Sequence, residues 1–463
     1  MNQTVIDRFR NPGPATPPDS EPHPQPARLP APGDADATGL PFPFLVELML
    51  KTLFQGGQLR LWECREQTLL PLGVVESIVG FMRAERLCEI QRAAAAGNDM
   101  YFALTDLGRL RAQDALAKNQ YIGPCPVSLE NYVAQVEKQS IVGSRHVGRD
   151  EMRRAFDGII LPDGLIDQVG PALNSGRSIF IYGPAGTGKT YLAERFALAL
   201  ALRGGIWVPY AFAVDSDVIQ VFDPLVHRPM EVPGGESRGL DRQCSHDERW
   251  VKCTRPVVIA GGELTLDALD LEFDPVSRFY TAPPQVKANN GLLIIDDLGR
   301  QRVAAQDLLN RWIVPMDRRV DCLSLHNGKK FRIPFDVSQV FSTNLSPQDV
   351  ADEAFLRRFG YKLHLAGASE ERYRKLVQQA CSRLGVPFTD EAFRFLVQSL
   401  HGRTGRPLYA CYPHDLVSRV RDRAFYEGVM PELNPETLEW AWTAYFGDLE
   451  PTAPSHHRGG QMS

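Results

Sequence analysis

The sequence predicts an α/β protein built on a doubly wound parallel sheet, followed by an α-helical domain and preceded by a small α+β domain. Short apolar strands alternate with helices over residues 147–368, which is typical of a parallel sheet covered by helices on both faces. Over residues 369–449 only helical periodicity remains, which indicates a separate helical unit. Residues 42–118 combine helical segments with one pair of strands.

Composition limits the classes to consider. With 463 residues the chain is too long for a single core, and 43% hydrophobic and 23% charged residues are ordinary for a globular protein. A formal net charge of −5 provides no overall basic field for nucleic acid or anionic membranes, although a local basic patch is compatible with it. No stretch reaches the roughly 20 apolar residues that span a bilayer, and the N-terminus lacks a signal-peptide core. We expect a cytoplasmic protein.

Eight cysteines are scattered along the chain without a CxxC pair, which favours reduced thiols over a disulfide framework. Cys244, His246 and Cys253 could form half of a metal site, but the paired spacing of structural zinc sites is missing. We therefore expect no structural metal.

Both ends of the chain are expected to be disordered. Residues 1–41 are rich in proline and hold few large apolar side chains, so burial cannot offset the entropy of ordering them. The polar residues 450–463 form a second tail, and residues 119–146 are predicted to be a linker with one short helix.

Residues 42–118 contain three helical segments, two strands joined by a hairpin and a closing helix with Thr105 as its N-cap. This order resembles a winged helix-turn-helix domain. Its candidate recognition helix offers only Arg83 among the cations that phosphates and base edges require. Protein contact is therefore preferred for this module, while Arg109 and Arg111 on the closing helix leave DNA binding as the alternative.

The strongest signal is SIFIYGPAGTGKT, a strand and glycine-rich turn that lead into the helix YLAERFALALALR. The motif Gly183-x4-Gly188-Lys189-Thr190 in this context predicts a phosphate-binding P-loop. Glycines let successive N–H groups point at phosphate oxygens, Lys189 reaches the β- and γ-phosphates, and the Thr190 hydroxyl binds Mg²⁺. The predicted ATP-binding residues of the loop are Gly183, Pro184, Ala185, Gly186, Thr187, Gly188, Lys189, Thr190 and Tyr191.

The second half of the site is the apolar strand in GLLIIDDLGR, which ends at Asp296 and Asp297. Asp296 is predicted to hold Mg²⁺, directly or through water, as a Walker B carboxylate does. Asp297 would then orient and deprotonate the attacking water.

With these motifs the last 300 or so residues resemble the AAA+ family of P-loop ATPases. The resemblance implies a helical lid, hydrolysis of Mg-ATP between subunits, and a homo-oligomeric ring, by analogy a hexamer. The family carries Glu where Asp297 stands. The shorter side chain requires the water to sit closer to the strand, so we expect slow hydrolysis.

The resemblance also assigns three further functions. Asn344, after the strand in VSQVFSTNLS, matches the sensor-1 position that holds the attacking water. Arg357 and Arg358 in DEAFLRRFGYKL are both candidates for the arginine finger that reaches the ATP of the adjacent subunit. His414 occupies the sensor-2 position, where the family usually has Arg, with Arg406 and Arg419 as nearby alternatives.

One segment exceeds the minimal fold, a hairpin insertion over about residues 205–285 that turns at Ser216 and Asp217. Within it, Phe279 and Tyr280 are candidate pore or partner contacts, and burial under the insertion is the alternative.

The predicted function is a AAA+ ATP hydrolase that remodels, loads or unfolds a partner protein. The alternative is a DNA-associated ATP-dependent switch, a transcription regulator or helicase-loader-like protein that binds DNA through its winged helix. A metabolic phosphotransferase fits less well, because a kinase needs an acceptor pocket in place of the sensor, finger and lid.

Overall fold

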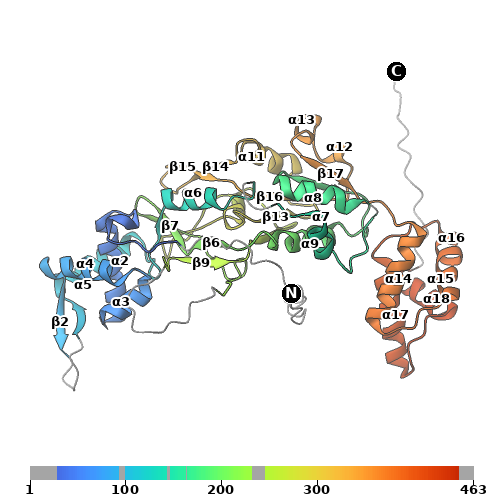
Figure 1. Cartoon of the computed structure of the whole chain (residues 1–463), viewed down its shortest axis with the longest axis horizontal. Coiled ribbons are helices and arrows are strands. Elements are labelled where there is room, and N and C mark those ends of the chain that lie inside the picture. Colours follow the sequence, from blue (N-terminus) through green and yellow to red (C-terminus); the bar gives the residue numbers. More distant parts are fainter. Residues whose placement is uncertain (1–28, 93–99, 143–145, 163, 232–245, 448–463) are drawn as a thin grey trace.

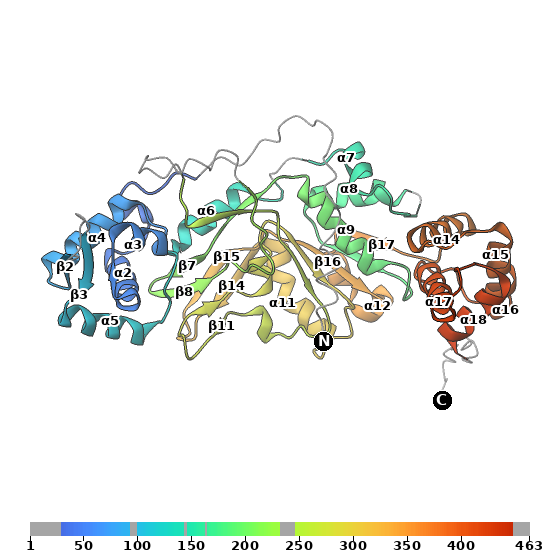
Figure 2. The same ribbon diagram turned by 90° about the horizontal axis from the view of Figure 1, so that it is seen from below.

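The computed structural model describes residues 29–92, 100–142, 146–162, 164–231 and 246–447. Its centre is a five-stranded sheet in which every neighbouring pair is parallel, in the order β10-β13-β16-β5-β17 (Figures 1 and 2). The predicted P-loop strand β5 lies between β16 and β17, and the predicted Walker B strand β13 lies on the other side of β16. The strands are β10 (Val257–Ala260), β13 (Leu292–Ile295), β16 (Ser338–Thr343), β5 (Ile179–Tyr182) and β17 (Tyr361–His364).

The apolar strands are covered on both faces, as their sequences require. Ile179 and Ile181 point into a core formed with helices α7, α8 and α9, whereas Phe180 points into a core formed with α11, α12 and α13. This arrangement confirms the predicted doubly wound sheet. The helices are α7 (Arg149–Ala155), α8 (Leu165–Ser175), α9 (Lys189–Ala201), α11 (Ala305–Arg318), α12 (Pro347–Val350) and α13 (Glu353–Leu356).

The C-terminal region is helical, as predicted, and lies at one end of the elongated molecule (Figure 1). It has its own core, which includes Tyr373, Phe393, Leu416 and Trp442. Its elements are α14 (Glu370–Leu384), α15 (Asp390–Arg394), the π-helical segment η4 (Phe395–His401), α16 (Gly402–Thr404), α17 (Tyr412–Glu427) and α18 (Pro435–Phe446).

The N-terminal module lies at the opposite end of the molecule (Figures 1 and 2). Its three short strands form an antiparallel sheet in the order β1-β3-β2, and the side chain of Thr105 caps the closing helix by accepting from the Gly108 N–H at 3.1 Å. The elements follow the predicted order with one added strand, β1. They are α2 (Phe42–Gly56), β1 (Gln58–Leu59), α3 (Leu61–Thr68), α4 (Leu72–Ala84), β2 (Cys88–Arg92), β3 (Met100–Leu104) and α5 (Asp106–Lys118).

The insertion builds a second β region between this module and the central sheet. A five-stranded sheet in the order β11-β12-β8-β7-β4 lies beside the antiparallel pair β6–β9 and the hairpin β14–β15. Val214 pairs with Asp217, so the chain turns at Asp215 and Ser216, within one residue of the predicted position. The elements are β4 (Val127–Ser128), β6 (Ile206–Pro209), β7 (Ala211–Val214), β8 (Asp217–Gln220), β9 (Trp250–Cys253), η3 (Asp267–Leu269), β11 (Glu272–Phe273), β12 (Tyr280–Thr281), α10 (Pro284–Lys287), β14 (Val320–Ser324) and β15 (Lys330–Pro334).

Two segments are more ordered than the sequence predicts. Within the stretch 29–41, which contains η2 (Asp36–Thr38), Thr38 and Leu40 are buried, and the carbonyl of Thr38 accepts from Arg249 Nη1 at 3.3 Å. The expected linker 119–146 contributes β4 to the insertion sheet and α6 (Leu129–Lys138), whose Tyr132 is buried against Phe212. Both segments pair with residues far away in the sequence, which composition does not reveal. Residues 1–28 and 448–463 lie outside the described part.

The candidate pore residues Phe279 and Tyr280 both pack against other segments, although Phe279 is only partly buried. Tyr280 is buried, and its hydroxyl accepts from the His326 N–H at 3.0 Å. The Phe279 ring meets the Tyr121 ring edge-on, with centroids 5.6 Å apart. The pore role is therefore wrong for Tyr280, and burial under the insertion is the correct alternative. Among the described helices, none combines the length and apolarity needed to cross a bilayer.

Candidate active site

The P-loop connects the end of β5 to the start of α9. Gly183, Gly186 and Gly188 have φ angles of +142°, +82° and +94°, a region in which side chains with a Cβ are strained. A Cβ on Gly183 would lie 2.2 Å from the Leu365 carbonyl oxygen, and a Cβ on Gly186 would lie 2.6 Å from Cys411 Sγ. A Cβ would therefore be strained at all three positions and would clash at Gly183 and Gly186, and the N-terminus of α9 opens onto this loop.

Lys189 lies on the inner side of this loop and is only 6% exposed. Its ammonium group donates to the carbonyl oxygens of Gly183 at 2.9 Å and Pro184 at 2.8 Å, and to Asn344 Oδ1 at 2.6 Å. Burial lowers the pKa of Lys189, while the nearby carboxylates of Asp297 and Asp296 act in the opposite direction. The lysine is thus held where the loop curls, next to both acids of the second motif.

Thr190 and Asp296 come together as the sequence predicts. The Thr190 hydroxyl lies 2.9 Å from one carboxylate oxygen of Asp296 and 3.2 Å from the other. A hydroxyl and a carboxylate are hard oxygen ligands of the kind that Mg²⁺ prefers in phosphate-transfer sites. This pair therefore fits a magnesium ion.

Asn344 follows β16 and reaches both halves of the site. Its amide oxygen accepts from Lys189, and its amide nitrogen donates to Asp297 Oδ1 at 2.9 Å. Because β16 lies between β5 and β13, a residue at its carboxyl end is adjacent to the ends of both neighbouring strands. One amide thus connects the P-loop lysine to the proposed base.

Two residues that the sequence interpretation missed support the acids. Ser342 Oγ donates to Asp296 Oδ1 and accepts from the Asp297 backbone N–H at 3.4 Å. Gln301 is 9% exposed, and its amide donates to the Asp296 carbonyl oxygen at 3.1 Å and accepts from the Gly299 N–H at 2.8 Å. Ser342 lies two residues before Asn344 in a strand that also contains Ser338, Gln339 and Thr343, so its hydroxyl gave no distinct signal.

The backbone at Asp297 has φ +51°, in the left-handed region that Asp and Asn tolerate better than most residues. Asp297 is thereby turned away from the line of β13 and toward Asn344. A local conformation of this kind at a strand end is common where a side chain performs chemistry.

The helical domain contacts the P-loop through the start of α17. The Cys411 N–H donates to the Gly186 carbonyl oxygen at 3.0 Å. His414 is exposed, with Nδ1 3.7 Å from the Asp415 carboxylate. The alternatives Arg406 and Arg419 stack on Phe446 and Tyr445 of their own domain, at 4.2 and 4.6 Å from the ring centroids. A sensor-2 function for His414 remains a prediction.

Arg357 and Arg358 are not part of this cluster. They directly precede β17, which runs parallel to β5, so they lie at the amino-terminal edge of the sheet, whereas the P-loop lies at the carboxyl-terminal edge. A four-residue strand separates these edges by about 10 Å or more. The geometry is therefore unsuited to contact with the ATP of the same subunit.

Comparisons with known proteins give limited matches. Residues 369–444 match a family described as a domain of unknown function (DUF8689). No curated protein matches the sequence. Among solved structures, NtrX from Brucella abortus in complex with ADP is 14% identical, with 76% of this chain and 62% of that chain covered and a TM-score of 0.36. The Thermotoga maritima RuvB Holliday junction branch migration motor is 15% identical, with coverages of 68% and 71% and a TM-score of 0.33.

Proposed function

We propose that this chain is a AAA+ ATPase that hydrolyses Mg-ATP at the interface between subunits. The observation that carries the proposal is the convergence of Lys189, Asp297 and Asn344 at adjacent strand ends, beside the Thr190–Asp296 pair. A strand order of β10-β13-β16-β5-β17 places these groups together, and a helical domain touches the same loop. This combination fits nucleotide hydrolysis better than phosphate storage or structural use of the loop.

Each residue has a defined part in the proposed reaction. The loop N–H groups and Lys189 bind the β- and γ-phosphates of ATP. To do so, Lys189 releases the carbonyl oxygens of Gly183 and Pro184 and donates to phosphate oxygens instead. Thr190 and Asp296 would hold Mg²⁺, which would supply positive charge to neutralise the phosphates. Asp297 accepts a proton from the attacking water, and the Asn344 amide keeps that carboxylate and the water in line.

The position of Arg357 and Arg358 supports catalysis between subunits. Because both lie at the far edge of the sheet from their own P-loop, an arginine finger from this segment would act on the ATP of a neighbouring copy. Oligomerisation into a ring, by family resemblance a hexamer, is part of the proposal. The energy of ATP hydrolysis would be used to remodel a partner protein. The N-terminal module, which lies at the opposite end of the molecule from the helical domain, would recruit that partner.

The first test is magnesium-dependent ATP binding and hydrolysis by the folded full-length chain. Lys189→Ala should abolish binding, whereas the matched exposed control Lys330→Ala should leave it unchanged. A folded wild-type chain without magnesium-dependent nucleotide affinity would refute the proposal.

The remodelling role has its own test. Asp297→Asn should bind ATP without hydrolysing it, which traps a partner in the bound state. Affinity capture with this variant, compared with Lys189→Ala as the control that binds no nucleotide, should enrich a specific protein. Equal recovery with both variants would contradict remodelling and leave ATP hydrolysis itself untouched.

A further inference from the structure

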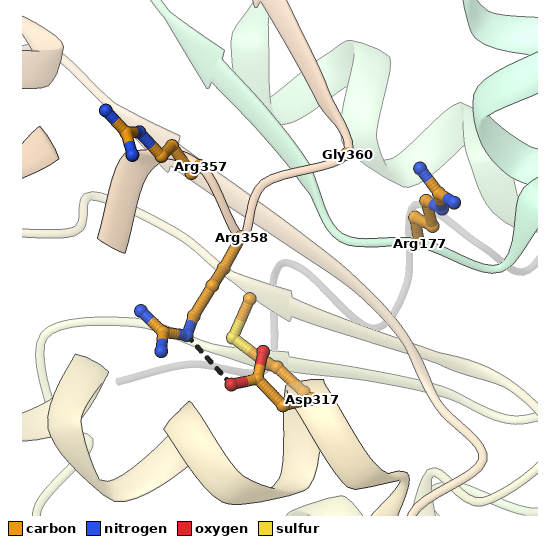
Figure 3. A pocket seen from close by; sticks show the side chains of 6 residues that line it. Arg177, Asp317, Arg357, Arg358 and Gly360 are labelled. Carbon is orange, nitrogen blue, oxygen red and sulfur yellow. Dashed lines mark hydrogen bonds and ion pairs between the residues drawn. The ribbon is translucent and has the colours of Figure 1, made fainter. Parts of the chain in front are cut away.

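An open pocket of 560 Å³ lies at the amino-terminal edge of the central sheet, away from the P-loop. Three arginines line it, from two separate segments of the chain (Figure 3). Arg357 and Arg358 are the finger candidates, but Arg177, two residues before β5, was not expected there. The remaining lining residues are Met316, Asp317 and Gly360.

The pocket has excess positive charge. Its one acid, Asp317, accepts from Arg358 Nε at 3.1 Å, as Figure 3 shows. Arg357 pairs with Glu353 at 2.7 Å, but the two side chains are 76% and 83% exposed, so solvent screens this pair and it contributes little. Arg177 is exposed, and its guanidinium has no hydrogen bond or ion pair with any residue in the described part of the chain. An anion is the matching occupant.

The base of the Arg177 side chain is held firmly. Its backbone N–H donates to Ser175 Oγ at 3.1 Å, and the following residues enter the buried strand β5. A Cβ on Gly360 would lie 2.6 Å from Arg177 Cβ, so the lack of a side chain at Gly360 is what lets the two segments pack this closely. Arg177 therefore lies two residues before a buried strand of the central sheet, whereas Arg357 follows a helix of only four residues.

We infer that Arg177 is a third basic residue of the subunit interface and that it binds the triphosphate of ATP held by a second copy of this chain. The inference rests on the proposed function. The occupant follows from two observations, that the pocket is open and that three arginines line it, together with the proposed finger function of Arg357 or Arg358. A second copy of the chain brings the required anion, because its own P-loop holds the phosphates.

The different anchoring of the two arginines predicts a division of labour. A guanidinium that contacts the triphosphate equally in the ground state and the transition state lowers KM without raising kcat, and Arg177 is assigned this uniform contact. The finger is assigned the charge that develops in the transition state. Arg177→Ala should therefore raise the KM for ATP about tenfold, the range expected for one charged hydrogen bond, and leave kcat within about twofold.

Steady-state ATPase assays of full-length Arg177→Ala and Arg177→Lys test this, with Arg154→Ala as a control that removes another exposed arginine. Circular dichroism confirms that each variant is folded. The lysine variant should recover part of the KM, and the control should match wild type. An unchanged KM in Arg177→Ala, with wild type active, overturns the inference but leaves the proposed function standing.

Mixing distinguishes an effect on a neighbour from an effect within one subunit. Lys189→Ala subunits cannot bind ATP but still present Arg177, and Arg177→Ala subunits have an intact P-loop. In a mixture of the two, some interfaces regain both elements, so a fraction of the activity should return to the wild-type KM. If the mixture shows only the raised KM of Arg177→Ala, Arg177 acts on its own subunit and the inference is wrong.

Discussion

Asn344 joins Lys189 to Asp297, with its amide oxygen 2.6 Å from the lysine Nζ and its amide nitrogen 2.9 Å from the aspartate Oδ1. The three residues come from positions far apart in the sequence, and the order of the parallel strands brings them together. An amide can serve both neighbours at once because it carries an acceptor and a donor on one plane. This dual contact is the basis for the proposed sensor function of Asn344.

Replacement of Asn344 should therefore separate binding from chemistry. In Asn344→Ala we expect kcat for ATP to fall about 100-fold, as for the loss of one oriented donor near a reacting group, while ATP affinity changes little. Single-turnover hydrolysis and equilibrium nucleotide binding measure the two quantities separately.

Asn344→Asp is the matched control, since it keeps the shape and the acceptor for Lys189 but loses the donor toward Asp297. It should be as slow as the alanine variant. Near-normal turnover in Asn344→Asp would show that the contact with Asp297 has no catalytic importance.

The two finger candidates are expected to differ. The Arg357 side chain is 76% exposed, whereas the Arg358 side chain is 29% exposed and forms an ion pair with Asp317 on α11. Arg357→Ala should lower kcat by about 1000-fold and should poison wild-type subunits when mixed with them. Arg358→Ala should have a smaller effect, of about tenfold or less, because that side chain is already engaged within its own subunit.

The measurement is ATPase activity against the fraction of variant subunits at constant total protein. Poisoning gives a curve that falls below the straight line of simple dilution. A strictly proportional loss with Arg357→Ala would exclude action on a neighbouring subunit, and stronger poisoning by Arg358→Ala would reverse the assignment.

The sequence predicted which residues of the candidate site lie together more completely than it predicted the architecture around them. Lys189, Thr190 and Asp296 belong to local motifs in which a few adjacent residues carry both the turn and the chemistry, so their positions follow from the strand and helix that flank them. Ser342 was missed because β16 also contains Ser338 and Thr343, and no local signature distinguishes one of these hydroxyls from the others. Only the pairing of β16 with β5 and β13 shows which acid it faces.

The extent of the insertion could not be predicted for a related reason. Residues 29–41 and 119–146 are rich in proline and polar side chains, so they resemble a tail and a linker. In the structure Val127 and Ser128 pair with β7, more than eighty residues ahead. Such pairing depends on which strand has an unpaired edge in the folded protein, and the composition of a segment carries no information about these edges.

Acid should destabilise the protein through His227. This side chain is 1% exposed; Nδ1 accepts from the Asp223 N–H at 3.0 Å, so Nε2 carries the hydrogen and donates to the Lys287 carbonyl oxygen at 2.9 Å. Burial lowers the pKa of His227 from 6.5 to about 4. Between these two values the unfolded chain binds a proton that the folded chain does not, so the free energy of unfolding falls with decreasing pH, by about 3 kcal/mol in total.

Urea unfolding of wild type and His227→Gln over this pH range checks the effect. Glutamine can keep one donor and one acceptor but does not titrate. The slope of the free energy of unfolding against pH should therefore be smaller in His227→Gln than in wild type, by the contribution of about one proton. The comparison isolates His227 from His401, whose pKa is also lowered by burial. Parallel curves for the two proteins would mean that His227 titrates normally in the folded state.

The ion pair of Asp247 and Arg249 should be essential for joining the N-terminal segment to the insertion. Both side chains are almost fully buried, and the guanidinium contacts the carboxylate through Nε at 2.9 Å and Nη2 at 2.8 Å. Arg249 Nη1 also reaches the carbonyl oxygens of Thr38 at 3.3 Å and Pro126 at 3.4 Å, so one side chain ties three segments together.

Removal of one partner leaves a buried charge without compensation, which typically costs 3 to 5 kcal/mol. We therefore expect Asp247→Asn to lower the free energy of unfolding by about 3 kcal/mol, and Arg249→Met to cost a similar amount. The control is Glu371→Gln, which breaks the exposed pair with Lys375 and should leave the free energy of unfolding nearly unchanged.

A double variant tests whether charge burial dominates. Asp247→Leu with Arg249→Met removes both charges, so it should lower the free energy of unfolding by less than either single change. If the loss in the double variant equals the sum of the two single losses, the carbonyl contacts of Arg249, and not its charge balance, hold the three segments together.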